Sequence, residues 1–382
     1  MPETYSVRGF GAMIADRARM DALERALERA MRPGSVVLDI GTGTGIFALM
    51  ACRLGARQVY AVEPGDAIHL ARQVARENGM ADRIRFIQGV STEIELPERA
   101  DVVVSDLRGV LPLFQHHVPS IVDARERLMV PGGVLIPRSD TLRAAPVEAE
   151  EAHRKVVAPW DEHARGFRMD APRRAAVNTW AKAEIDPARL VAEPRTWAVL
   201  DYRTIRDPDV RGTLAWTAAR DAAAHGIAVW FDAEVAEGIG YTTGPEAPGS
   251  IYGTALFPWP HPVPLAAGDA VTVELQARLT GDDYVWVWET RVERGDGSRM
   301  ELRQTTFLAQ PLSAEALRRR AHDFRPVLGE DGRIDQAVLG MMDGGATLGD
   351  IARELQRRFP ERFASWEEAL SRAGRLSQAC AR

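Results

Sequence analysis

The sequence has almost no cysteine, with only Cys52 and Cys380 among 382 residues. Two cysteines so far apart form no disulfide framework and lack zinc-ligand spacing, so we predict no metal site and a reducing, cytoplasmic location. Long hydrophobic runs are also missing, since no stretch approaches about 18 uninterrupted apolar residues. The N-terminus carries charge where a signal peptide needs an apolar run. We therefore expect a soluble protein with no membrane partner.

An excess of positive charge is absent as well. The chain has 48 Lys and Arg against 54 Asp and Glu, which gives a net charge of -6 at pH 7. No concentrated basic helix with base-reading residues stands out, so we expect no nucleic-acid partner. At 382 residues the chain is long enough to bury a large core and to form two or three domains.

The hydrophobic pattern divides the chain into three regions. Over residues 1–145, helical periodicity alternates with short β-branched runs, which predicts a parallel sheet covered on both faces. Residues 146–312 are rich in short strands separated by Gly, Asp and Pro, and this is typical of an antiparallel sandwich or barrel. Residues 313–382 predict a short strand followed by helices, one of them capped by Thr347 with Asp350 at the third position. The predicted fold class is α/β.

The clearest chemical motif is "VLDIGTGTGIFALMACRLGARQVYAVEP", residues 37–64. A buried strand ends at Asp39, and a helix begins near Ile46. The turn between them contains Gly41, Thr42, Gly43 and Gly45. Such a turn directs backbone amides and the positive end of a helix at a ligand. The second strand ends in Glu63, where a carboxylate can accept both hydroxyls of an adenosine ribose.

The glycine spacing distinguishes between two nucleotide-binding families. A dinucleotide fingerprint needs glycine at position 46, which is Ile46 here. The order D-x-G-x-G-x-G instead resembles the first motif of class I methyltransferases. That resemblance implies a Rossmann-like domain that binds S-adenosyl-L-methionine and releases S-adenosyl-L-homocysteine. The alternative is a tight turn with a purely structural purpose.

The resemblance narrows to the protein arginine methyltransferases over about residues 5–310. Four segments match that family in order and spacing: "YSVRGFGAMIADRARMDAL", "GVSTEIELPERADVVVSD", "WFDAEVAEGIGYTTGPEAPGSIYG" and "FPWPHPVPLAAGD". The family implies a doubly wound methyltransferase domain, then an antiparallel β-barrel with a helical arm that often makes a head-to-tail dimer. Residues 157–180 lie where that arm would be. The equally open alternative is that these residues form a surface insertion that makes no dimer contact.

The same resemblance assigns further cofactor residues. Arg19 matches the basic residue that pairs with the methionine carboxylate. Ser91 and Thr92 occupy the stretch that faces adenine, although the family usually has glutamate where Thr92 stands.

The segment "SDLRGVLPLFQHH", residues 105–117, matches the loop in which the family carries two glutamates that grip the acceptor guanidinium. Here these positions are Asp106 and Gln115. A cation buried between one carboxylate and one amide has only one negative charge to offset the cost of its burial. The family's Thr-His-Trp segment is also altered, to Ser250, Ile251 and Tyr252.

These departures predict a changed acceptor. Our main hypothesis is methyl transfer to an N or O nucleophile of a peptide or a natural-product-type small molecule. Asp106, Gln115 and His116 are the candidate catalytic residues, and the sequence does not decide between His116 and His117. One alternative is a true protein arginine methyltransferase with a second carboxylate from elsewhere. Another is a noncatalytic scaffold that binds the cofactor or a peptide.

The region 313–382 resembles, at modest specificity, the small winged-helix peptide chaperone of pyrroloquinoline quinone biosynthesis. The resemblance implies a leader peptide as partner. The alternative is a small helical cap.

Overall fold

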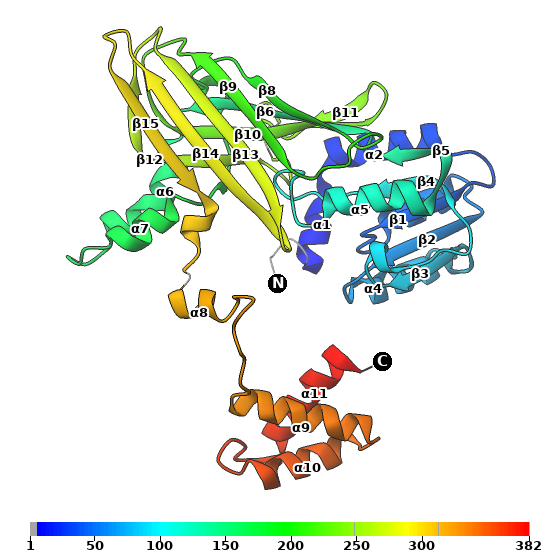
Figure 1. The fold of residues 1–382 in the computed structure, drawn as a ribbon. Coiled ribbons are helices and arrows are strands. Elements are labelled where there is room, and N and C mark those ends of the chain that lie inside the picture. The colour runs from blue at the N-terminus through cyan, green and yellow to red at the C-terminus, as the bar shows by residue number, and fades with distance from the viewer. Residues whose placement is uncertain (1–5, 248, 312, 382) are drawn as a thin grey trace. The chain divides into compact units, whose positions relative to one another are not determined.

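A computed structural model describes residues 6–247, 249–311 and 313–381 (Figure 1). Tyr5 and Pro248, which belong to the family segments quoted above, lie outside the described residues. The chain divides into two compact units, Met1–Pro311 and Leu312–Arg382.

The first part of the larger unit is a parallel sheet with strand order β3-β2-β1-β4-β5. Its strands are β1 (Val36–Ile40), β2 (Gln58–Glu63), β3 (Ile84–Gln88), β4 (Ala100–Ser105) and β5 (Met129–Ile136). Every residue of β1 is buried, as expected for a central strand of a sheet covered on both faces. The strand order reverses at β1, and ligands bind outside the carboxyl ends of strands at such a point. The predicted α/β class is confirmed.

Helices and short helical turns connect these strands. They are α1 (Val7–Ala15), α2 (Arg17–Ala30), α3 (Ile46–Arg53), α4 (Ala67–Glu77), η2 (Ala81–Arg83), η3 (Ser91–Glu93), α5 (His117–Asp123) and the π-helix η4 (Ala124–Leu128). The helix α2 buries Leu23 and Leu27 one turn apart and lies against β10 and β11 of the following domain.

The second part of the larger unit contains two antiparallel sheets. One has the order β7-β12-β10-β6-β8 with β11 paired to β10, and the other has the order β15-β14-β13-β9. The first sheet comprises β6 (Ser139–Val147), β7 (Ala181–Ala183), β8 (Arg195–Asp201), β10 (Ala222–Ala236), β11 (Ile239–Thr242) and β12 (Thr254–Leu265). The second comprises β9 (Val210–Thr217), β13 (Ala270–Thr280), β14 (Asp283–Glu293) and β15 (Arg299–Thr305).

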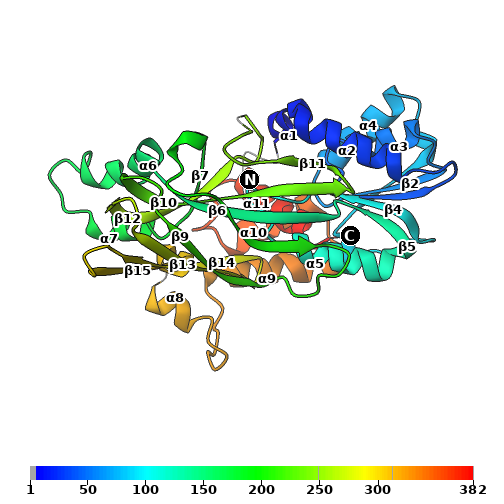
Figure 2. The same cartoon turned by 90° about the horizontal axis from the view of Figure 1, so that it is seen from above.

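Aromatic side chains join the two antiparallel sheets. Phe257 of β12 lies 5.2 Å from Trp286 and 5.3 Å from Trp288 of β14, measured between ring centroids. Burial alternates along β14, so both tryptophans face the same core. Figure 2 shows these sheets beside the parallel sheet within the larger unit.

Two helices after β6 form the predicted arm region, and short turns complete the unit. They are α6 (Glu150–Asp161), α7 (Asp170–Ala176), η5 (Pro187–Arg189) and η6 (Thr306–Ala309). The Arg173 Nε lies 2.8 Å from the Asp161 carboxylate and ties α7 to α6. Figure 1 shows this helical pair projecting from one side of the antiparallel sheets.

The smaller unit consists of helices. They are α8 (Ala314–Arg318), α9 (Glu330–Asp343), α10 (Leu348–Arg358) and α11 (Trp366–Cys380). Ile334, Val338, Ile351 and Leu355 contribute to its core. The predicted cap is confirmed, because Thr347 Oγ1 accepts a hydrogen bond of 3.2 Å from the Asp350 amide.

The predicted short strand of this unit is wrong, and with it the winged-helix expectation. Residues 324–328 form no strand, and none occurs among residues 313–381 as described. An isolated extended segment has unpaired backbone groups, and this unit offers it no second strand to pair with. Across the part of the chain that the structure describes, no helix is both long and apolar enough to cross a membrane.

Candidate functional site

The turn after β1 is shaped by glycine. Gly41, Gly43 and Gly45 have φ angles of 73°, 53° and 89°, a region that L-residues with side chains rarely adopt. Space is limited too, because a Cβ atom on Gly43 would lie 2.7 Å from the Phe10 ring. The turn is anchored by the Gly41 and Thr42 amides, which donate to the Val62 carbonyl at 2.9 and 3.0 Å.

Asp39 lies beneath this turn and is buried. Its Oδ2 accepts hydrogen bonds from Thr42 Oγ1 at 2.5 Å and from the Ala48 amide at 3.1 Å. Its Oδ1 is buried and has no hydrogen-bond partner among the described residues. Burial raises the pKa of Asp39 to about 7.

Glu63, at the end of β2, faces the same turn. Its Oε2 accepts from the Gly43 amide at 3.0 Å, and its Oε1 accepts from the Gly65 amide at 2.9 Å. The structure therefore brings Asp39, the glycine turn and Glu63 together at the carboxyl edge of the parallel sheet. Ser91 is buried at the start of η3, whereas Thr92 is exposed.

Arg19, on α2, is buried beside the helix that follows the turn. Its guanidinium lies 5.4 Å from the centre of the Phe47 ring on α3. Its Nε and Nη2 lie 2.6 and 2.5 Å from Asp106 Oδ2. Arg19 thus joins the predicted cofactor side of the site to the predicted acceptor side.

Asp106 follows β4 and has partners on both oxygens. Oδ2 accepts from Arg19 and from the Tyr252 hydroxyl at 2.7 Å, and Oδ1 accepts from Arg108 Nε at 3.0 Å. Burial alone would raise the pKa of Asp106, but the guanidiniums of Arg19 and Arg108 outweigh it and hold the pKa well below its usual value.

Arg108 is fully buried and is held by a second carboxylate. Its Nη1 donates to Asp140 Oδ1 at 3.2 Å and to the Tyr241 hydroxyl at 3.0 Å. Asp140 Oδ2 in turn accepts from the Tyr202 hydroxyl at 2.5 Å. Burial raises the pKa of Asp140 to about 6, even though Arg108 opposes the shift. We call these side chains the Asp106 cluster: Arg19, Asp106, Arg108, His117, Asp140, Tyr202, Tyr241 and Tyr252.

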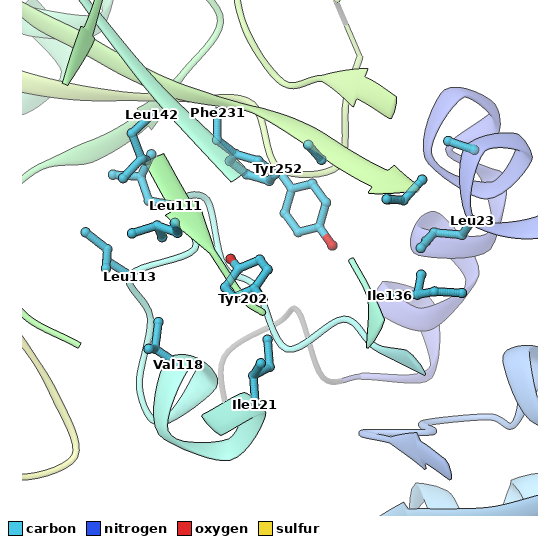
Figure 3. Close-up of a cluster of buried hydrophobic side chains, with 14 of the residues drawn as sticks. Leu23, Leu111, Leu113, Val118, Ile121, Ile136, Leu142, Tyr202, Phe231 and Tyr252 are labelled. Atoms are coloured by element: carbon cyan, nitrogen blue, oxygen red, sulfur yellow. The ribbon is translucent and has the colours of Figure 1, made fainter. Parts of the chain in front are cut away.

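Apolar side chains pack against the loop that carries Asp106 and Arg108. Figure 3 shows Leu111 and Leu113 of the loop, together with Val118 and Ile121 of α5, near Leu142, Tyr202 and Phe231 of the antiparallel domain. All of these side chains are buried. The loop after β4 is therefore held by packing between the two domains of the larger unit.

The remaining predicted catalytic residues are not brought into the cluster. His116 is half-exposed and lies 3.3 Å from the Asp282 carboxylate. Gln115 is exposed, with a left-handed φ of 43°. His117 is instead the buried histidine, with Nε2 3.1 Å from the Tyr202 hydroxyl. Burial, reinforced by Arg108, lowers the pKa of His117 to about 3, so its imidazole is neutral near pH 7. The geometry favours His117 over His116 as the histidine near Asp106.

The sequence analysis missed Asp140, Tyr202 and Tyr241. Asp140 could have been found from the period-two pattern of β6, because residue 140 shares a strand face with Leu142 and Ala144. A carboxylate on an apolar strand face needs a buried cation, which the sequence alone does not identify.

Comparison with protein families gives two matches. Residues 22–156 match the model of ribosomal protein L11 methyltransferase (PrmA), and residues 138–290 match the arginine methyltransferase oligomerization subdomain. The matches overlap at β6 and together extend over both domains of the larger unit.

Individual relatives give the same result. The chain is 31% identical over 277 residues to protein arginine N-methyltransferase 2 of Mus musculus, a match that covers 68% of this chain and 61% of the relative. It is 29% identical over 231 residues to probable protein arginine N-methyltransferase 6 of Arabidopsis thaliana, with 58% of this chain and 53% of the relative covered. The chain thus spans little more than half the length of these relatives.

Solved structures show the fold. The crystal structure of Arabidopsis thaliana protein arginine methyltransferase 10 aligns with a TM-score of 0.69 at 22% identity, covering 79% of this chain and 98% of that one. The Trypanosoma brucei PRMT1 enzyme-prozyme heterotetrameric complex with AdoHcy aligns with a TM-score of 0.71 at 22% identity, covering 79% and 99%. The chain resembles class I methyltransferases and, among them, the protein arginine methyltransferases.

Proposed function

We propose that this chain is an S-adenosylmethionine-dependent methyltransferase of the protein arginine methyltransferase type. The observation that carries the proposal is the glycine turn with Asp39 below it and Glu63 beside it, at the edge where the strand order reverses. The orphaned Asp39 Oδ1 and the left-handed glycines fit a ligand that approaches the backbone closely. When bound, S-adenosylmethionine supplies an electrophilic methyl group.

The chain's own residues would hold that cofactor in assigned ways. Glu63 would accept the ribose hydroxyls, and Arg19 would pair with the methionine carboxylate. Ser91 and Thr92 would face adenine, while Gly41, Thr42, Gly43 and Gly45 would let the backbone approach. The position of Arg19 supports its pairing with the methionine carboxylate. It lies beside Phe47 of α3, and its guanidinium already binds one carboxylate, that of Asp106.

A binding measurement tests this site. We expect calorimetry to show that Glu63→Ala weakens S-adenosylmethionine binding by about tenfold or more, because one charge-assisted pair of hydrogen bonds is lost. Glu77→Ala, an exposed carboxylate on α4, is the matched control and should bind as the wild type does. Equal affinities in all three proteins would remove Glu63 from the site. Absence of binding to the wild type would refute the proposed cofactor.

The acceptor that the relatives favour is an arginine side chain in a protein. Their names support the alternative hypothesis of the sequence analysis over its main hypothesis of a small-molecule or natural-product acceptor. Methyl transfer is an in-line displacement, so the protein's task is to align the nucleophile and exclude water. In this proposal Asp106 would orient the nucleophile.

Incubation of the protein with labelled donor and an arginine-rich peptide tests the acceptor. We expect methylarginine after acid hydrolysis of the peptide, and none when every arginine in the peptide is replaced by lysine. Label in the lysine peptide, or in neither peptide while the donor still binds, would contradict arginine as the acceptor.

One observation supports a second class of acceptor. Both oxygens of Asp106 already bond to guanidiniums of the chain itself, and Gln115 is exposed. An acceptor with an uncharged N or O nucleophile needs no free carboxylate pair. Transfer to a peptide that lacks arginine, located by mass spectrometry, would establish this class.

Assembly and location complete the proposal. The oligomerization subdomain match supports a homodimer, and the arm formed by α6 and α7 is its proposed contact.

The helical unit after residue 311 is proposed to bind a peptide, such as a leader segment of the substrate. A cytoplasmic location accords with two cysteines that are both free.

A further inference from the structure

Asp106, the carboxylate proposed to orient the acceptor, is already bound by the guanidinium of Arg108 from the same loop. Arg108 Nε donates to Asp106 Oδ1 at 3.0 Å, and the Arg108 side chain is 0% exposed. On the other oxygen, Arg19 and the Tyr252 hydroxyl are both bound. An acceptor guanidinium that approached Asp106 would find neither oxygen free for a bidentate pair, the geometry that makes such contacts strong.

Arg108 is also fixed in place. Its guanidinium lies 5.4 Å from the centre of the Phe231 ring and 5.7 Å from that of Tyr241. Asp140 holds its Nη1, and the side chains of Asp140 and Arg108 are both 0% exposed. Withdrawing Arg108 would leave two buried carboxylates with one cation fewer, which is strongly unfavourable. An incoming cation therefore has to bind beside Arg108 instead of replacing it, and like charges so close repel each other.

We infer that Arg108, held by Asp140, is a specificity-determining residue that weakens binding of an acceptor guanidinium at Asp106. The inference rests on the proposed methyl transfer from S-adenosylmethionine, and it predicts that an arginine acceptor binds weakly and therefore reacts with a high KM. A second feature supports it: Arg108 Nη2 is buried and has no hydrogen-bond partner among the described residues. An unpaired donor on a buried guanidinium leaves positive charge beside Asp106 that disfavours a second cation there.

Wild-type protein allows a direct test with matched peptides. One peptide contains arginine at a single position, and the other contains citrulline, the uncharged ureido analogue of arginine, at that position. With S-adenosylhomocysteine present, we expect calorimetry to show that the citrulline peptide binds at least as tightly as the arginine peptide. Tighter binding of the arginine peptide by about tenfold or more, equivalent to one good charge-assisted contact, would overturn the inference.

A double variant with unchanged net charge tests whether Arg108 weakens binding of an acceptor guanidinium. Arg108→Met combined with Asp140→Asn removes one positive and one negative charge, frees Asp106 Oδ1 and keeps an acceptor for the Tyr202 hydroxyl. We expect the Kd of the arginine peptide to fall by about tenfold, and KM to fall while kcat changes much less. Arg143→Met with Asp232→Asn is the matched control, since this 3.0 Å ion pair also includes a residue of β6 but is more exposed and lies outside the Asp106 cluster.

The outcomes separate this inference from the proposed function. Failure of the wild type to bind S-adenosylmethionine refutes the function, whatever the peptides do. Cofactor binding with an unchanged or weaker arginine-peptide Kd in the double variant overturns the role of Arg108 alone. Where the double variant does not fold, the comparison of citrulline with arginine in the wild type decides.

Discussion

At the scale of single residues, Asp39 is a carboxyl group that the fold holds out of water, with one oxygen bonded twice and the other unpaired. Burial raises its pKa from 3.8 to about 7, so the folded protein binds this proton more tightly than the unfolded chain does. The stability that Asp39 contributes is therefore complete below about pH 3.8 and is lost as the pH rises to about 7.

Asp39→Asn should remove this pH dependence, because an amide does not ionise. Between pH 4 and 7 the free energy of unfolding of the wild type should lose up to about 1.4 kcal/mol per pH unit relative to the variant. Urea unfolding at several pH values measures the difference. Asp82→Asn, at an exposed position in η2, serves as the control. Parallel pH profiles of wild type and Asp39→Asn would show that folding does not shift the pKa of Asp39.

The residues of the site differ in how far sequence could predict them. Asp39, Glu63 and the glycines lie within one strand-turn-helix-strand unit, so local spacing places them together. The contacts of Asp106 join residues distant in the chain: Arg19 is 87 positions away and Tyr252 is 146. No local pattern encodes such pairings, since they depend on how two domains pack. The exposure of Gln115 and His116 follows from the same packing.

At the scale of elements, the parallel and antiparallel sheets follow from hydrophobic periodicity, which is strong in both. The strand expected near residue 326 does not form, because a strand depends on a neighbour that a single segment does not reveal. The arm is an intermediate case: the structure contains its helices α6 and α7, whereas the dimer contact that we propose for them involves a second copy of the chain.

Phe167, between α6 and α7, is 71% exposed and makes the arm testable. If the arm forms the proposed dimer, an apolar side chain at this tip becomes buried in the contact, and a carboxylate there opposes association. We expect Phe167→Asp to convert a dimer into a monomer in sedimentation velocity. Val199→Asp, at a 59% exposed position on β8, should leave the mass unchanged. A wild-type monomer, or a dimer that survives Phe167→Asp, would identify the arm as a surface insertion.

At the scale of the whole molecule, the proposed cofactor site and the proposed peptide site lie in different units of the chain. Every residue assigned to the cofactor or to the Asp106 cluster lies in the unit that ends at Pro311. The smaller unit has its own core and its own groove, which is lined by apolar Leu328, Leu339 and Met342 and by the carboxylates of Asp335 and Asp343. Asp335 is paired with Arg372 at 2.6 Å, so Asp343 is the carboxylate of this lining that could pair with a basic residue of an amphipathic peptide.

Removing residues 312–382 should therefore leave S-adenosylmethionine affinity within about twofold of the full chain while abolishing binding of a basic amphipathic peptide. Calorimetry with each ligand measures both. In the full chain, Leu339→Asp places a charge in the groove and should weaken the same peptide without affecting the cofactor, because it leaves the core residues Ile334 and Val338 in place. Peptide binding that persists after truncation would locate the peptide site in the larger unit, and reduced cofactor affinity would show that the two units do not act separately.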